Sequence, residues 1–123
     1  MNTAIWIIQG LMGALFLMAG AMKVTQAKTT LKEKLGGWVD DFSILTLKAI
    51  GAIEILGATA LILPMLLNKY LFLTPLAATG LILTMIGASI AHLKRKENKE
   101  IIKNIVITAL LIAILVGRKS LLF

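Results

Sequence analysis

The sequence lacks cysteine entirely and contains a single histidine, His92. Without thiols these 123 residues form no disulfide, carry out no thiol redox chemistry and offer no thiolate ligand to a metal or an iron–sulfur cluster. This excludes a membrane thiol oxidoreductase of the vitamin K epoxide reductase type. One histidine is also too few for bis-histidine haem ligation, and the sequence predicts no metal site.

Acidic residues are scarce as well. Six Asp and Glu stand against thirteen Lys and Arg, which gives a net charge of +7. Ten of the thirteen basic residues fall within residues 23–48 and 94–103, and the others are Lys69, Arg118 and Lys119. These positions follow the ends of apolar blocks, so membrane topology and anionic lipid headgroups explain the charge. We expect a lipid bilayer as partner and no nucleic acid.

Hydrophobic residues make up 59% of the chain and occur in long blocks rather than on periodic faces. The sequence therefore predicts an all-α protein, a transmembrane four-helix bundle in which residues 1–123 form a single domain. The expected spans are residues 3–23, 45–67, 70–93 and 101–118, joined by cytoplasmic loops at 24–44 and 94–100.

Four spans place both basic clusters on the same side of the membrane. By the positive-inside rule these loops are cytoplasmic and both termini lie outside. The last block is short and contains Lys103, so three spans plus an interfacial helix is the alternative. The first block lacks a basic n-region, which favours a retained helix, although Ala19-Gly20-Ala21 resembles a cleavage site.

Glu54 is the one charged residue inside the second apolar block. At a rise of about 1.5 Å per residue it lies about 9 Å from Lys48 and about 22 Å from Lys69 along the helix. A carboxylate at this depth is costly and usually faces the protein interior beside a partner. Gly51 and Gly57 share its face of the helix and allow another helix to approach closely.

Other polar residues fall in the same half of the bundle: Thr84 near the depth of Glu54, and Lys23 and Asn104 about 9 Å below it. Helical side chains lean toward the N-terminus of their helix, so Lys23 and His92 lean back into the bilayer while Glu54 leans toward them. We predict a ligand-binding or polar cluster of Lys23, Glu54, Thr84, His92 and Asn104.

Each of these residues also has a structural explanation. Lys23 can mark a helix end, His92 can be interfacial and Asn104 can cap a helix. A Glu54–Lys23 pair can simply fix the helix register.

The long loop adds two aromatic residues, Trp38 and Phe42. Because they are four residues apart, we expect them together at the membrane interface, as headgroup anchors or as a lid over the inner mouth of the bundle. Before them, residues 28–35 are expected to form a short helix that ends at Gly36-Gly37.

Four motifs occur in order along nearly the whole chain: Phe16-Leu-Met-Ala-Gly20-Ala-Met-Lys23, Gly51-Ala-Ile-Glu54-Ile-Leu-Gly57-Ala58 with Leu63-Pro64, Thr74-Pro75-Leu-Ala-Ala, and His92-Leu-Lys-Arg-Lys-Glu97. Together they resemble the DoxX-like family of small bacterial four-helix membrane proteins. The resemblance implies a bacterial inner-membrane protein. It also implies a link to quinone-dependent redox systems, since relatives are described as subunits of a membrane thiosulfate:quinone oxidoreductase and others are linked to redox homeostasis.

Three functions fit these residues. The first is a binding or accessory protein, not an enzyme on its own, that holds a quinone headgroup or lipid near Glu54 and Lys23 and serves a membrane redox partner. The second is a small proton-coupled transporter or channel-like homo-oligomer in which Glu54 titrates. The third is a structural scaffold. A cavity open at the inner leaflet favours binding, a continuous water path favours transport, and a dry Lys23–Glu54 contact favours structure.

Overall fold

The computed structural model describes residues 2–122, and nearly all of them are helical. No strand occurs in this part of the chain, which confirms the all-α prediction. The elements, in chain order, are α1 (Asn2–Thr25), α2 (Lys28–Leu35), the 3-10 turn η1 (Gly37–Asp41), α3 (Ile44–Leu67), α4 (Leu73–Lys94), α5 (Asn98–Arg118) and the 3-10 turn η2 (Lys119–Leu122).

The four long helices are each long and apolar enough to cross a membrane. The fourth, α5, begins at Asn98 and has 21 residues, so it extends for about 30 Å, the thickness of a bilayer core. This length supports four spans over three spans with an interfacial helix. The short α2 is the helix expected at residues 28–35, and it ends at Gly36, whose φ of 116° few other residues adopt.

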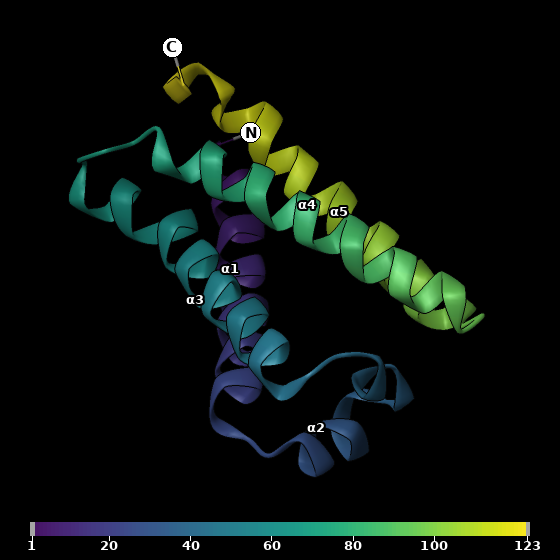
Figure 1. Cartoon of the computed structure of the whole chain (residues 1–123). Helices are drawn as coiled ribbons and strands as arrows, with labels where there is room; N and C mark the ends of the chain where they lie inside the picture. The colour runs from purple at the N-terminus through teal and green to yellow at the C-terminus, as the bar shows by residue number, and fades with distance from the viewer. Residues whose placement is uncertain (1, 123) are drawn as a thin grey trace.

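The long helices form two antiparallel pairs that cross one another (Figure 1). One pair is α1 with α3 and the other is α4 with α5, while α1 also touches α5 and α3 touches α4. The pairs diverge toward the end of the molecule that carries α2, η1 and the α4–α5 turn, which we call the loop end. Both chain termini lie at the opposite, terminal end (Figure 1).

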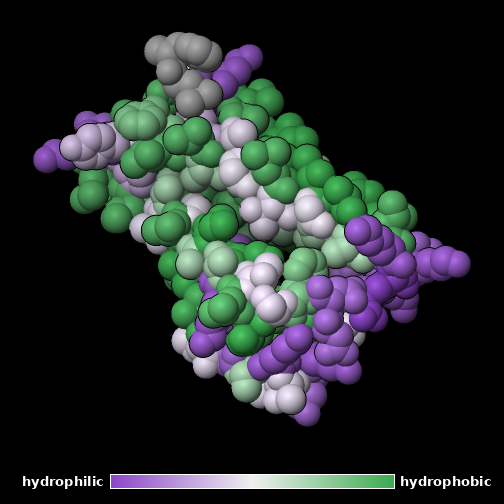
Figure 2. Space-filling model, viewed as in Figure 1, coloured by the Kyte–Doolittle hydropathy of each residue, from purple (hydrophilic) through white to green (hydrophobic). Residues whose placement is uncertain are grey.

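The surface is divided in the same way. Hydrophilic residues gather at the loop end, whereas the bodies of the long helices are hydrophobic over most of the face in Figure 2. Large apolar side chains point outward from every long helix, for example Leu11, Leu56, Leu83 and Ile105. In water such a surface is unfavourable, so these side chains contact the lipid bilayer.

Close backbone contact joins α1 to α3 at Gly20 and Gly51. A Cβ added to Gly20 would lie 2.5 Å from the carbonyl oxygen of Gly51, and one added to Gly51 would lie 2.7 Å from the carbonyl oxygen of Gly20. Gly57, two turns further along α3, faces α4 instead, where a Cβ would lie 2.7 Å from the side chain of Leu81. The small-residue face of α3 therefore points into the bundle, as its sequence predicts.

Pro64 lies inside α3, which continues past it to Leu67. Proline has no N–H to donate to the carbonyl four residues earlier, that of Ala60. The hydroxyl of Thr74 on α4 donates to this carbonyl at 3.1 Å and thereby joins the two helices. The connecting turn uses left-handed backbone at Asn68 and Tyr70, which is why α4 starts at Leu73 and not at residue 70.

Candidate functional site

Lys23 and Glu54 form a buried ion pair between α1 and α3. The Nζ atom of Lys23 donates to Oε1 of Glu54 at 2.6 Å, and their side chains are only 10% and 3% exposed. Gly51 makes room for this pair, because a Cβ there would lie 2.8 Å from the Cβ of Lys23. The partner predicted for Glu54 is therefore in direct contact with it.

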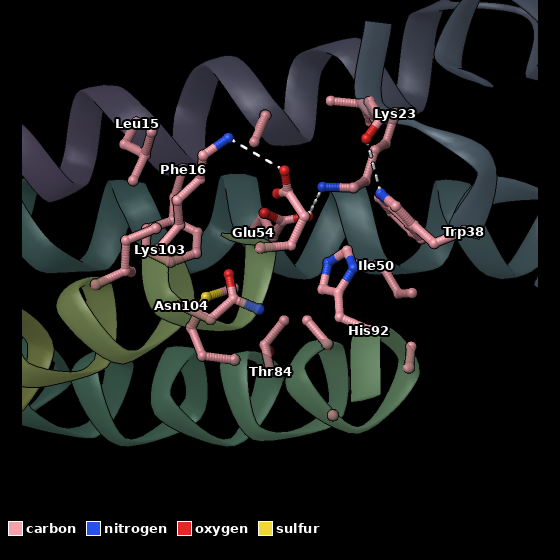
Figure 3. Close-up of a pocket in the computed structure, with 18 of the residues that line it drawn as sticks. Leu15, Phe16, Lys23, Trp38, Ile50, Glu54, Thr84, His92, Lys103 and Asn104 are labelled. Atoms are coloured by element: carbon pink, nitrogen blue, oxygen red, sulfur yellow. Dashed lines mark hydrogen bonds and ion pairs between the residues drawn. The ribbon is translucent and has the colours of Figure 1, made fainter. Parts of the chain in front are cut away.

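A cavity of about 500 Å³ lies beside this ion pair, between the two diverging helix pairs (Figure 3). Its size falls within the range of small-molecule sites, about 300–1,000 Å³. Leu15 of α1 and Lys103 of α5 line the cavity and are exposed on the molecular surface. The cavity is therefore open to the outside of the bundle between α1 and α5. Most of its wall is apolar, with side chains such as Phe16, Ile50, Met85, Ala88 and Ile107.

His92, near the end of α4, contributes a buried imidazole to the cavity wall. Its Nδ1 atom lies 3.0 Å from Oε1 of Glu97. In Figure 3 the His92 ring lies on the side of the cavity facing the Lys23–Glu54 pair. No hydrogen bond between His92 and that pair occurs within residues 2–122.

Trp38 and Phe42 line the cavity at the loop end. The Trp38 ring lies edge-on to Phe42 at a centroid distance of 5.9 Å and to His92 at 5.6 Å. Its Nε1 atom donates to the carbonyl of Leu35 at 3.0 Å, which joins it to the last turn of α2. The two aromatic residues contact each other at the cavity, and their role as headgroup anchors or as a lid stays a prediction.

Ion pairs connect η1 to its surroundings. Arg95, just after α4, donates from Nε and Nη2 to the two carboxylate oxygens of Asp41, at 2.6 and 3.1 Å. Hydrogen bonding to Arg95 lowers the pKa of Asp41, and hydrogen bonding to Lys32 of α2 lowers the pKa of Asp40 in the same way. The Arg95–Asp41 pair connects η1, which contains Trp38, to the α4–α5 turn.

The remaining two predicted residues line the cavity from the α4–α5 side. Thr84 donates its hydroxyl to the carbonyl of Gly80 in its own helix at 3.1 Å, and Asn104 donates to the hydroxyl of Ser89 at 3.4 Å. The structure thus places all five predicted residues on one cavity, but only Lys23 and Glu54 bond to each other. Residues 2–122 contain no cluster of three or more side chains suited to holding a metal.

A second buried polar group, at the terminal end, was not expected from the sequence. The side-chain amide of Gln9 donates to the carbonyl of Leu61 at 2.6 Å and accepts from Nε of Arg118 at 2.8 Å. Arg118 also donates to Asn2 at 2.6 Å and lies over the Trp6 ring, 5.7 Å from its centroid. This group holds α1, α3 and α5 together and has no cavity of its own among those described.

Glu97 is the functional candidate that sequence reasoning missed. The sequence gives little indication of a contact between Glu97 and His92. The two residues are five apart, which is not a spacing that shares a helix face, and Glu97 comes after the end of α4. Only the conformation of the α4–α5 turn brings its carboxylate back to the imidazole.

The fold is that of a small multi-pass membrane protein, with four helices able to span a bilayer. A buried ion pair and a cavity lie between these helices. The model of the DoxX-like family matches residues 7–114, which is most of the chain. The chain therefore belongs to the DoxX-like family. No significant match was found among the curated proteins or among the solved structures.

Proposed function

We propose that the protein binds a small amphiphilic molecule, quinone-like or lipid-like, whose headgroup occupies the cavity beside Lys23 and Glu54. One observation carries this proposal: a largely apolar cavity of about 500 Å³ between the long apolar helices has charged and polar side chains converging on it. Apolar walls with a few convergent polar groups are typical of small-molecule sites.

The polar groups retain capacity to bind a headgroup. The ammonium of Lys23 has three N–H donors and its one ion-pair contact is with Glu54, whose carboxylate has a second oxygen. A headgroup oxygen has donors in Lys23 and Asn104, and a headgroup hydroxyl has an acceptor in Glu54. An apolar tail has room along Leu15, which is exposed where the cavity opens.

The proposed setting is the bacterial inner membrane, with the basic loops in the cytoplasm and both termini outside. The excess of basic residues in residues 23–48 and 94–103 supports this orientation. The chain has no cysteine and one histidine, so electrons would pass through a bound organic molecule or a partner. We therefore propose an accessory role beside a membrane redox partner, without catalysis by this chain alone.

Thermal unfolding in detergent tests the proposal. Wild type and Glu54→Gln are compared with and without a panel of quinones and lipids, and Glu33→Gln, on the exposed face of α2, is the matched control. We expect at least one compound to raise the Tm of wild type and of the control, and to lose this effect in Glu54→Gln. If no compound raises the Tm of any of the three proteins, the proposal is wrong.

A structural role for the ion pair is the second candidate. The direct 2.6 Å contact of Lys23 with Glu54, next to the Gly20–Gly51 backbone contact, favours it. In that case Glu54→Gln lowers the Tm by several degrees, and no ligand shifts either protein. The same measurement therefore separates the two candidates.

A further inference from the structure

His92 and Glu97 are held together by the end of α4. Lys96 has a left-handed φ of 58°, the N–H of Lys96 donates to the carbonyl of Leu93, and the N–H of Glu97 donates to the carbonyl of His92. These are the bonds of a Schellman motif. They turn the chain back on the helix, so that the Glu97 carboxylate reaches the imidazole of His92 at 3.0 Å.

This contact fixes which nitrogen of His92 carries the proton. An ionised carboxylate only accepts hydrogen bonds, so the Nδ1 atom that faces Glu97 must donate. In the neutral ring Nε2 is then an acceptor. Nε2 makes no hydrogen bond with any residue from 2 to 122, and the His92 side chain is 7% exposed while lining the cavity.

Among residues 2–122, no unpaired charged side chain faces the ring across the cavity. Lys23 is paired with Glu54, and Lys103 is paired with Glu100 at 3.2 Å. In that part of the chain the carboxylate in contact with the imidazole is Glu97, whose side chain is 28% exposed and reaches the solvent side of the loop end. The imidazole thus has solvent-connected Glu97 on one nitrogen and the cavity on the other.

We propose that the cavity selects a headgroup that carries a hydroxyl, and that this hydroxyl donates to Nε2 of His92. Glu97 is a positioning residue that fixes the tautomer. The inference rests on the proposed binding function and narrows its ligand from any amphiphile to a hydroxyl-bearing one, such as a phenol with an apolar tail. An ether or a methylated hydroxyl of the same shape has no proton to donate.

The test compares a matched pair of probes, 4-nonylphenol and 4-nonylanisole. Trp38 contacts His92 and lines the cavity, and Trp6 is the other tryptophan, so the Trp6→Phe protein reports occupancy through Trp38 fluorescence alone. We expect the phenol to bind about tenfold more tightly than the methyl ether, the effect of one buried hydrogen bond.

Two substitutions should reduce or remove this preference. In His92→Phe the acceptor is gone, so the two probes bind equally. In Glu97→Gln the amide either donates to or accepts from Nδ1, so the tautomer is no longer fixed and the preference falls severalfold. Glu100→Gln is the matched control. It removes a carboxylate that itself lines the cavity and is paired with Lys103, and it should keep the preference.

The outcomes separate this inference from the proposed function. Equal binding of phenol and ether to wild type would overturn the inference and leave the binding function standing. An undiminished preference in Glu97→Gln would also overturn it, even if His92→Phe does not fold. If neither probe binds, and no compound of the quinone and lipid panel does, both proposals are wrong.

Discussion

The Lys23–Glu54 pair is the residue-scale feature on which the site depends. Both side chains are nearly inaccessible, so each charge relies on the other for compensation. Removing one partner from such a pair leaves an uncompensated buried charge, whereas replacing both with apolar groups is often close to neutral. Single and double substitutions therefore have very different expected costs.

We expect Lys23→Met to lower the free energy of unfolding by roughly 3–5 kcal/mol. The double variant Lys23→Met, Glu54→Leu should recover most of this loss, because no buried charge remains. Unfolding in detergent measures both, with the exposed Lys32→Met as a control that changes stability little. Additive effects of the two single substitutions would contradict this account.

At the residue scale, helix direction made one contact foreseeable from the sequence. Lys23 and Glu54 were expected to approach each other because their side chains lean toward one another from helices that run in opposite directions, and they are in contact. The partner of His92 was missed because it depends on the left-handed backbone of Lys96, which the sequence does not mark with a glycine. The Gln9–Arg118 contact joins residues 109 positions apart, for which no local pattern exists.

At the scale of helices, the sequence predicts the features that depend on the length of the apolar blocks and on the residues at their ends. The four spans follow from block length and hydropathy, and the short α2 follows from its glycine stop. The divergence of the two helix pairs does not follow, because it depends on where glycines allow close contact and where they contact nothing. A Cβ at Gly20 would meet backbone, whereas one at Gly87, which lines the cavity, would meet nothing within 4 Å.

The contact between α3 and α4 yields an element-scale prediction. Thr74→Val removes the hydroxyl that donates to the Ala60 carbonyl, so we expect a loss of about 1 kcal/mol in the free energy of unfolding. In a Pro64→Ala background the restored N–H donates to the same carbonyl, so the cost of Thr74→Val should be smaller. A double-mutant cycle of unfolding measures this coupling, and equal costs in both backgrounds would show that the proline plays no part.

The attachment of η1 to α4 should depend on pH. Because the pKa of Asp41 is lowered in the folded protein, its pairing with Arg95 contributes stability above the ordinary pKa of aspartate. That contribution is lost as the pH falls through the lowered value. Trp38 fluorescence of Trp6→Phe, followed from about pH 6 to about pH 2, should change as η1 detaches. Asp41→Asn should show the detached signal already at neutral pH; a wild-type-like signal there would contradict the assignment.

The orientation of the chain in the membrane is a property of the whole molecule. The absence of cysteine makes single-cysteine variants clean reporters, and the unsubstituted protein is the control that takes up no thiol reagent. With a membrane-impermeant maleimide, we expect Lys69→Cys, in the α3–α4 turn, to react in intact cells. Lys96→Cys, in the α4–α5 turn, should react only after the cells are opened. The reverse pattern would place the basic loops outside the cytoplasm.

The packing of the terminal end also limits how the cavity exchanges its contents. Phe16 and Met85 line the cavity and belong to the same buried apolar cluster as Leu61 and Leu111, so the cavity ends blindly toward the termini. Under the proposed function, a ligand would therefore enter and leave sideways, through the opening between α1 and α5, and not along the bundle axis toward the termini.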